Sequence, residues 1–425
     1  MKVAVYTLGC RLNQSESESI LDSFLRNGFE KGELYESDIV VVNTCTVTSK
    51  AEQKARRVVR KLEKSASLII VTGCYVEVSE EEVDGLSSKI VSFSLDEKGD
   101  ILSLPLFLKG CGKEELLEKA RSFPKVITSR FAFDSNTFSY HSRAYLKVQD
   151  GCDNECGYCK TTIARGKSIF LPVDEAVKRA LELEDMGFHE IVLTGVNLSN
   201  YDHSGGGLST LLEALLSALS SSMRIRFSSL EADGIDDRLL SLIGDERIFP
   251  HFHLPLQSAS QKVLSYVGRN YSMDHLRYVI DVLRRIKGDP FIASDVIAGL
   301  PGESDEDFAE TVDFVRKYDI STLHVFPYSP REGTKLYGDR NRVPERVRDE
   351  RAGILRKISD ENYKKYVSRW LGKSVEAIVE RKGDGVMYGT SGNYLKVVID
   401  SKDERKRGEL VSGTLTSLNP LVLSV

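Results

Sequence analysis

Three cysteines in residues 151–159 constrain this chain more than any other feature of its sequence. Cys152, Cys156 and Cys159 are separated by three and then by two residues. Thiols at this spacing can bend onto one small metal centre, but they leave it one short of the four protein ligands that a cubane iron–sulfur cluster normally takes. The spacing therefore predicts a cluster in which one iron has no protein ligand, and such an open iron suggests a catalytic role.

Two other uses of these cysteines fit the sequence less well. A zinc site would need further ligands of similar kind, and no His or Cys follows closely. A disulfide framework does not suit a 425-residue chain with seven cysteines and no secretory signal. The chain starts directly with a strand pattern and nowhere contains 18 consecutive apolar residues, which predicts a cytoplasmic protein without a membrane span.

The N-terminal third alternates apolar strand patterns with helical patterns. Residues 2–8, 38–44 and 67–73 predict strands that end at Cys10, Cys45 and Cys74. This alternation favours a doubly wound parallel α/β sheet, in which the carboxyl ends of the strands share one edge. The three cysteines should therefore meet as a second open site, although three buried structural thiols are the alternative. Cys111 has no partner at ligand spacing and is predicted to be a free thiol.

The middle of the chain follows a polar stretch, residues 134–142, that predicts a linker. Strand patterns follow at residues 144–150, 190–195, 224–230, 251–257, 291–298 and 322–328, with helical stretches between several of them. About six βα units predict a closed or nearly closed (βα) barrel with its active site at the carboxyl ends of the strands.

The last part of the chain changes character. Residues 341–369 predict a helix whose mixed charges indicate a solvated face. From residue 372 onward, short strand patterns alternate with turn residues and predict a small β-barrel. The net charge of −5 gives no global positive field, so binding of nucleic acid would require a local basic face. Basic residues of the terminal barrel could provide one, or could simply be solvated.

The cysteine loop, with Tyr158 just before its last cysteine, resembles the signature of radical S-adenosylmethionine (SAM) enzymes, and the whole chain resembles their methylthiotransferase family. The residues that carry this resemblance are Gly9-Cys10, Asn43-Thr44-Cys45, Gly73-Cys74, Asp150-Gly151-Cys152, Ala164-Arg165-Gly166, 254–258 and 326–334. The resemblance implies a methylthiotransferase domain at residues 1–133, a radical SAM domain at 134–368 and a TRAM domain that binds RNA at 369–425.

The flanks of Cys10 and Cys45 look most like the branch of the family that acts on N6-threonylcarbamoyladenosine in tRNA. Residues 7–14 and 43–48 resemble enzymes that convert N6-threonylcarbamoyladenosine beside the anticodon to its 2-methylthio derivative. An enzyme for isopentenyladenosine tRNA or for a ribosomal-protein aspartate is the alternative, and an iron–sulfur RNA-binding protein is the non-enzyme alternative. The resemblance implies two 4Fe-4S clusters and SAM as cofactors. It also implies a sulfur source and an electron donor such as flavodoxin or ferredoxin as partners.

The resemblance also suggests site residues. Cys152, Cys156 and Cys159 would hold the radical-generating cluster, and Cys10, Cys45 and Cys74 the cluster that handles sulfur. The predicted SAM contacts are Tyr158, Thr194, Gly195, Ser229, Glu231, Ile297 and Glu303, with Arg165, Gln257 and Arg331 as weaker candidates that loop anchoring would also explain. Residues 160–163 and 94–98 depart from the family pattern, which leaves the finer substrate contacts open.

Overall fold

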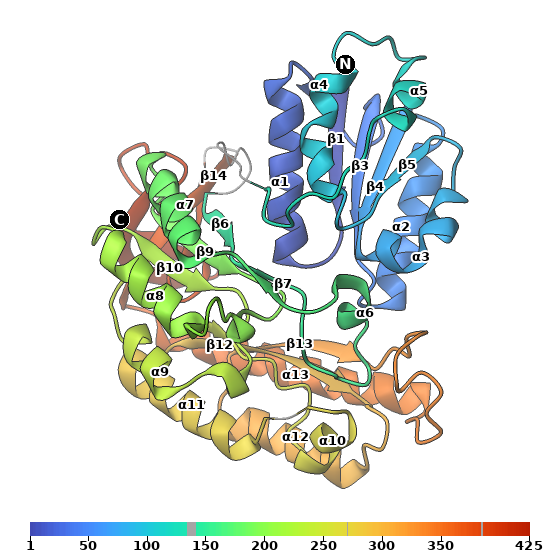
Figure 1. Ribbon diagram of the computed structural model, residues 1–425. Helices are drawn as coiled ribbons and strands as arrows, with labels where there is room; N and C mark the ends of the chain where they lie inside the picture. Colours follow the sequence, from blue (N-terminus) through green and yellow to red (C-terminus); the bar gives the residue numbers. More distant parts are fainter. Residues whose placement is uncertain (134–141, 270, 384–385) are drawn as a thin grey trace. The chain divides into compact units, whose positions relative to one another are not determined.

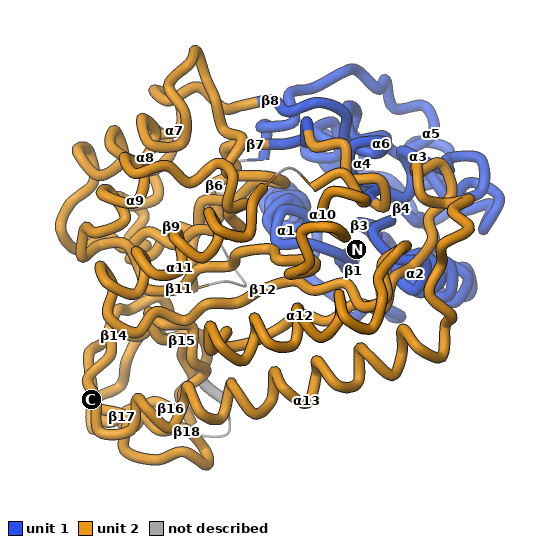
Figure 2. The backbone as a smooth tube through the Cα atoms, turned by 90° about the horizontal axis from the view of Figure 1, so that it is seen from below, with its two compact units in different colours: residues 1–140, 150–153, 159–169 blue, residues 141–149, 154–158, 170–425 orange. Residues whose placement is uncertain are grey.

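The computed structural model describes residues 1–133, 142–269, 271–383 and 386–425, and the chain forms two compact units. Unit 1 contains residues 1–140, 150–153 and 159–169, and unit 2 contains residues 141–149, 154–158 and 170–425 (Figure 2). The cysteine loop therefore contributes residues to both units. The linker predicted at residues 134–142 falls, apart from Ser142, outside the described residues.

Unit 1 is a parallel sheet with helices on both faces, as the alternating pattern predicted. Its strands run in the order β2-β1-β3-β4-β5. Their bounds are β1 (Lys2–Thr7), β2 (Glu30–Lys31), β3 (Ile39–Thr44), β4 (Leu68–Gly73) and β5 (Ile90–Phe93). Successive side chains of a strand enter opposite cores because the strand period is two. In β3, for example, Val41 packs in one core and Val42 in the other.

The two cores of unit 1 are covered by different helices (Figure 1). One core contains residues of α1 (Arg11–Arg26), the 3₁₀ turn η1 (Lys98–Leu102), α4 (Leu104–Leu108) and α5 (Leu116–Arg121). The other contains residues of α2 (Ser49–Leu62) and α3 (Cys74–Asp84). The short helix α6 (Thr161–Arg165) also belongs to unit 1 and contacts α3. Cys111 packs partly buried against the first core.

Unit 2 contains two three-stranded parallel sheets that continue one another. Their orders are β10-β9-β6 and β11-β12-β13. The bounds are β6 (Ala144–Lys147), β9 (Glu190–Thr194), β10 (Arg224–Phe227), β11 (His251–His253), β12 (Phe291–Ala298) and β13 (Thr322–Pro327). A bridge between Ile225 and Ile248 joins the two sheets. Within the described residues β13 does not pair with β6, so the six βα units form an open barrel.

The helices of unit 2 lie outside these sheets (Figure 2). They are α7 (Val173–Asp185), α8 (Gly207–Ala218), α9 (Asp237–Ile243), α10 (Gln261–Tyr266), α11 (Met273–Lys287), α12 (Asp305–Lys317) and α13 (Glu345–Arg369). Shorter elements are β7 (Gln149–Asp150), β8 (Ile169–Phe170), η2 (Leu198–Asn200) and η3 (Ala232–Gly234). Helix α13 is not solvated all round, because Leu355, Ile358 and Tyr366 are buried and the helix packs along β13 and β12.

The C-terminal residues form a closed barrel in the order β14-β15-β16-β18-β17. Its strands are β14 (Ser374–Gly383), β15 (Val386–Ser391), β16 (Lys396–Asp400), β17 (Leu410–Leu418) and β18 (Leu421–Ser424). The predicted small β-barrel is therefore confirmed. Its core includes Phe291 and Tyr366, so the barrel packs on β12 and α13 within unit 2.

A buried arginine joins the sheet to this barrel. Arg226 of β10 is fully buried and donates to Glu190 of β9 at 2.5 Å. It also donates to the carbonyl oxygens of Gly392 at 2.9 Å and Ser391 at 3.2 Å. Nearby, Arg224 pairs with Glu376 of β14 at 2.7 Å, but both of these side chains are partly exposed. Both arginines pair with a glutamate, but Arg226 is fully buried and Arg224 is partly exposed.

We expect Arg226→Ala to lower the free energy of unfolding by about 3–5 kcal/mol, because the carboxylate of Glu190 would stay buried without its partner. Arg224→Ala is the matched control, and loss of that partly exposed pair should cost about 1 kcal/mol or less. Urea unfolding followed by circular dichroism measures both values. Equal costs for the two variants would contradict the assignment of Arg226 as the buried link.

Candidate functional site

The three N-terminal cysteines follow three neighbouring strands of unit 1. Cys10 follows β1 and caps α1, Cys45 follows β3, and Cys74 follows β4 as the first residue of α3. The register pairs Thr44 with Gly73, so Cys45 and Cys74 leave the sheet at the same level. Cys45 and Cys74 are buried and Cys10 is exposed. The structure therefore brings these cysteines to one sheet edge, as predicted from their strand-end positions.

Two glycines allow the backbone to turn sharply before Cys10 and Cys74. Gly9 has φ +102° and Gly73 has φ +99°, a region that residues with a Cβ rarely adopt. A Cβ on Gly9 would lie 2.7 Å from the Cβ of Cys45 and 3.0 Å from its Sγ. A Cβ on Gly73 would lie 2.4 Å from the carbonyl oxygen of Thr44. The cysteine-bearing turns are therefore packed directly against one another.

Buried side chains from α1 and β3 hold these turns in place. The Asn13 amide donates to the carbonyl oxygens of Leu8 at 2.8 Å and Thr44 at 2.9 Å. The Asn43 amide donates to the carbonyl oxygen of Asn13 at 2.9 Å and receives a hydrogen bond from buried Lys98 at 3.0 Å. Because unpaired buried polar groups are costly, this network fixes the ends of β1 and β3 together.

Arg165 supplies a buried positive charge beside Cys74. Its Nε donates to Cys74 Sγ at 3.2 Å, and its two terminal nitrogens donate to Asp150 and Asn13 at 2.8 Å each. Burial lowers the pKa of Arg165, but the Asp150 carboxylate outweighs this effect and the pKa stays well above its ordinary value. Arg165 was a weak candidate for SAM binding, and the structure places its side chain at the N-terminal cysteine site.

The environment of these sulfurs suits a metal cluster. Burial raises the pKa of Cys45 to about 12 and also raises the pKa of Cys74, so both are neutral thiols without a metal. Opposing this, the Val47 N–H donates to Cys45 Sγ at 3.5 Å and Arg165 donates to Cys74. Donors directed at buried sulfurs stabilise thiolates. These three cysteines can therefore hold a metal cluster, and binding of the metal would release their protons.

The cysteine loop is anchored separately in each unit. In unit 1, the Cys152 N–H donates to the carbonyl oxygen of Gly166 at 3.1 Å, and the Thr161 N–H donates to Cys159 Sγ at 3.4 Å. In unit 2, the Gly157 N–H donates to the Val267 carbonyl oxygen at 2.8 Å. Cys152, Cys156 and Cys159 are all partly exposed. None of the three residues is fully enclosed by the protein.

Arg269 of unit 2 donates a hydrogen bond to Cys156, as Arg165 does to Cys74. Its Nη1 donates to Cys156 Sγ at 3.6 Å and to Glu231 Oε1 at 3.1 Å, and its Nη2 pairs with the other carboxylate oxygen. Burial raises the pKa of Glu231 and Arg269 acts in the opposite direction. Glu231 was predicted as a SAM contact, and in the structure it also holds Arg269. No sequence motif identified Arg269.

A polar network crosses the ends of β10 to β13. Ser229 Oγ lies 2.7 Å from His253 Nδ1, and His253 Nε2 lies 3.0 Å from Asp295 Oδ1. His324 Nδ1 lies 3.1 Å from the same carboxylate oxygen. Although burial opposes its ionisation, the two histidines hold the pKa of Asp295 well below its ordinary value. Ser229, a predicted SAM contact, therefore orients a histidine, which the sequence did not indicate.

The other predicted contacts lie at strand ends and loops of unit 2. Tyr158 and Ile297 pack against the same apolar cluster. The Thr194 hydroxyl donates to the Val192 carbonyl oxygen at 3.0 Å. Gly195 permits the close approach of Gln149, because a Cβ there would lie 2.8 Å from Gln149 Oε1.

Three further candidates anchor the backbone around this region. Glu303 accepts the Gly299 N–H at 2.9 Å and pairs with Arg351 at 2.5 Å, which closes the loop after β12. Gln257 has φ +59° and forms a bridge with Val296. Arg331 is buried, and its carbonyl oxygen accepts the Thr334 hydroxyl at 2.6 Å. These contacts agree with the anchoring role that was considered for Gln257 and Arg331.

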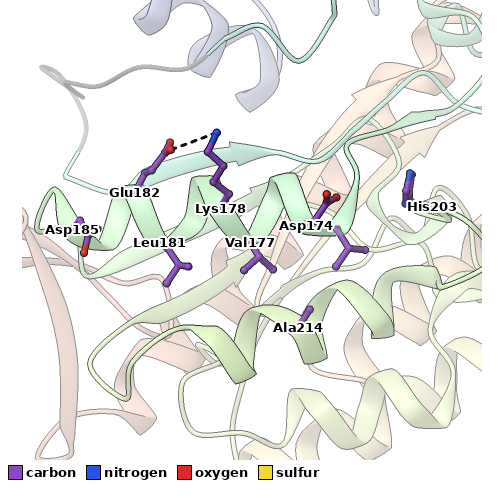
Figure 3. Close-up of a pocket in the computed structure, with 9 residues that line it drawn as sticks. Asp174, Val177, Lys178, Leu181, Glu182, Asp185, His203 and Ala214 are labelled. Atoms are coloured by element: carbon purple, nitrogen blue, oxygen red, sulfur yellow. Dashed lines mark ion pairs between the residues drawn. The ribbon is translucent and has the colours of Figure 1, made fainter.

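A surface hollow of about 850 Å³ lies elsewhere on unit 2 (Figure 3). Val177 and Leu181 of α7 extend toward Ala214 of α8, and the ion pair between Lys178 and Glu182 lies on the outer side of α7. Its lining includes none of the predicted site residues. This hollow is therefore not the candidate site.

Known protein families match both cysteine-containing parts of the chain. Residues 146–315 match the Radical SAM superfamily, and residues 2–93 match Uncharacterized protein family UPF0004. The threonylcarbamoyladenosine tRNA methylthiotransferase MtaB of Treponema pallidum is 34% identical over 93% of this chain and 94% of its own length. The tRNA-2-methylthio-N(6)-dimethylallyladenosine synthase of Endomicrobium trichonymphae is 30% identical over 95% and 94%.

The chain belongs to the methylthiotransferase family of radical SAM enzymes. Membership in this methylthiotransferase family makes the chain an enzyme and implies SAM and a 4Fe-4S cluster as cofactors. The radical SAM match contains Cys152, Cys156 and Cys159, and the N-terminal match contains Cys10, Cys45 and Cys74. Within the described part of this methylthiotransferase, each helix is too short or too polar to cross a membrane.

The fold likeness extends to solved structures. The radical SAM methyltransferase TsrM from Kitasatospora setae superposes with a TM-score of 0.57 at 12% identity, covering 79% of this methylthiotransferase and 77% of TsrM. At this identity the likeness concerns the fold alone.

We expect Gly9→Ala to destabilise this methylthiotransferase more than Gly28→Ala does. Both glycines have positive φ, +102° and +90°, so each substitution should cost about 1–2 kcal/mol in backbone strain. Only Gly9 also meets Cys45, whereas a Cβ on Gly28 has nothing within 4 Å, and overpacking should add about 1–3 kcal/mol. Urea unfolding of the metal-free variants measures the difference. Equal destabilisation would argue against close packing of the two turns.

Proposed function

We propose that this enzyme is a tRNA methylthiotransferase that converts N6-threonylcarbamoyladenosine beside the anticodon to its 2-methylthio derivative, using two 4Fe-4S clusters. The observation that carries the reaction type is the second cysteine triad, of which Cys45 and Cys74 are buried and Cys74 accepts a hydrogen bond from Arg165, because generating a radical from SAM requires only one cluster. The substrate assignment rests on the name of the Treponema relative and on the residues flanking Cys10 and Cys45.

In this proposal each cysteine triad holds one cluster. Cys152, Cys156 and Cys159 hold the cluster that SAM completes, and Cys10, Cys45 and Cys74 hold the second. When bound, these groups supply an electron, a carbon-centred radical and the methylthio sulfur. An aromatic C–H has no acidic proton to remove, so general-base catalysis by side chains cannot replace this chemistry.

The chain's own residues bind and orient the reactants. Arg165 and Arg269 each donate to one cysteine sulfur, which favours the thiolate that metal binding requires. Tyr158, Thr194, Gly195 and the loop from Ile297 to Glu303 contribute to the SAM pocket, together with Ser229 and Glu231. The stacked base in the tRNA loop has to be turned out of its stack to reach such a pocket.

The proposal assigns residues 1–133 to a methylthiotransferase domain, 134–368 to a radical SAM domain and 369–425 to a TRAM domain that binds RNA. It requires an electron donor such as flavodoxin or ferredoxin, a sulfur source and a cytoplasmic location. A second candidate substrate is tRNA bearing isopentenyladenosine, which is favoured by the relative from Endomicrobium trichonymphae.

We expect a methylthio product from tRNA bearing threonylcarbamoyladenosine and none from tRNA bearing isopentenyladenosine. The test uses anaerobically reconstituted protein with reductant, sulfide and SAM, followed by nucleoside digestion and mass spectrometry. A product from the isopentenyl tRNA alone would establish the second candidate. Formation of 5'-deoxyadenosine with neither tRNA modified would overturn the tRNA assignment, and a ribosomal-protein aspartate would be tested next.

Substitutions in the two triads should have separable effects. Cys156→Ala should abolish 5'-deoxyadenosine formation and lower the iron content by about four atoms per chain. Cys45→Ala should remove a similar amount of iron and abolish the methylthio product, but retain 5'-deoxyadenosine formation. Cys111→Ala is the matched control and should change neither iron content nor product. Unchanged iron in Cys45→Ala would refute the second cluster.

A further inference from the structure

Helix α2 of unit 1 carries a row of exposed basic side chains that the proposed chemistry does not use. The exposed members are Lys54, Arg57, Arg60 and Lys61 of the helix, and Lys64 two residues after its end. A shallow hollow of about 520 Å³ runs along them and is lined by Gln53, Arg56, Arg57, Arg60, Lys61 and Lys64. No acidic residue occurs between Gln53 and Leu62. This face of the helix is therefore strongly positive, although the overall charge of the chain is −5.

Most cations of this row have no partner of opposite charge. Among the described residues, the side chains of Arg57, Arg60, Lys61 and Lys64 make no ion pair, hydrogen bond or ring contact. Arg57 and Lys61, like Arg60 and Lys64, stand four positions apart, where like charges face and repel one another. By contrast, Arg56 on the flank pairs with Glu82 at 3.0 Å and donates to Tyr75 at 2.7 Å.

The row is presented on a rigid support. Ala55, Val58, Val59 and Leu62 of the same helix are buried in the core of unit 1. The Thr48 side chain caps the helix by accepting the Ala51 N–H at 3.2 Å. From Lys54 to Lys61 the exposed cations extend over about 10 Å along the helix axis. A nucleic acid duplex offers about six phosphates over such a length.

We propose that the basic row of α2 binds the phosphate backbone of the RNA substrate. This inference rests on the proposed function and adds to it a tRNA-binding surface on unit 1, far in sequence from the terminal barrel. An anionic membrane fits the row less well, because a helix that lies on a bilayer also buries exposed apolar side chains in it, in addition to its electrostatic attraction. The apolar face of α2 is already buried in the sheet core.

The test compares two double variants with the same change in formal charge. Arg57→Gln with Lys61→Gln alters the row, and Gln is as compatible with a helix as Lys or Arg. Lys109→Gln with Lys119→Gln is the control, at exposed positions of the α4–α5 region that covers the opposite face of the sheet. Binding of fluorescein-labelled tRNA is measured by anisotropy between 50 and 200 mM KCl. Thermal melting checks that both variants fold.

We expect the α2 variant to bind tRNA about tenfold more weakly at 100 mM KCl, and the slope of log affinity against log salt to fall by about 1.5. The control should change affinity less than twofold. Formation of 5'-deoxyadenosine without tRNA should be unchanged in both variants. The melting temperature of the α2 variant should not fall, because its substitutions relieve repulsion between like charges.

Several results would overturn the inference. Equal losses in both variants would indicate a general charge effect and not a binding surface. If the α2 variant binds tRNA as tightly as the wild-type protein, the row is not a tRNA-binding surface, and the proposed function still stands. Vesicles containing phosphatidylserine that bind wild-type protein but not the α2 variant, with tRNA binding unaffected, would assign the row to a membrane. Failure of the wild-type protein to bind any tRNA would remove the proposed function itself.

Discussion

The N-terminal site depends on one buried positive charge. Burial of a guanidinium costs several kcal/mol unless its hydrogen bonds are made, and Arg165 makes them to Asp150, Asn13 and Cys74. These partners come from three separate segments of unit 1, so one side chain connects β7, α1 and α3. The turn at Gly9 and the amide of Asn13 then fix the remaining cysteines around the same point. The position of each sulfur follows from this arrangement.

Each cysteine triad has an arginine that is itself held by a carboxylate. Arg165 pairs with Asp150 in unit 1, and Arg269 pairs with Glu231 in unit 2. Each arginine also donates to one cysteine sulfur, at 3.2 Å for Cys74 and 3.6 Å for Cys156. A guanidinium held in this way stabilises negative charge on sulfur without being free to rotate away. Both sites therefore place an arginine–carboxylate pair beside a cysteine sulfur, with Asp in one and Glu in the other.

The sequence was informative where a local pattern determines position. Strands β1, β3 and β4 of unit 1 and the six strands of the open barrel follow from apolar periodicity, whereas β2 and β5 were not predicted. The convergence of Cys10, Cys45 and Cys74 follows from their placement at strand ends. The location of Arg165 and the existence of the Arg269 contact could not be predicted in this way. Each depends on contacts between residues far apart in the chain, with separations of 91 for Arg165 and Cys74 and 113 for Arg269 and Cys156. The buried side of α13 was missed because abundant charges surround its apolar positions Ala352, Leu355, Ile358, Tyr366 and Val367.

The contact between Arg226 and the terminal barrel has a consequence for how the chain can fold as it is synthesised. Arg226 needs the carbonyl oxygens of Ser391 and Gly392, which follow it by 165 and 166 residues. Ribosomes add about 5–20 residues per second, so these acceptors emerge roughly 10–30 s after the arginine. During that interval the guanidinium of Arg226 lacks two of its hydrogen-bond acceptors. Unit 2 is therefore expected to complete its interior only after nearly the whole chain has left the ribosome.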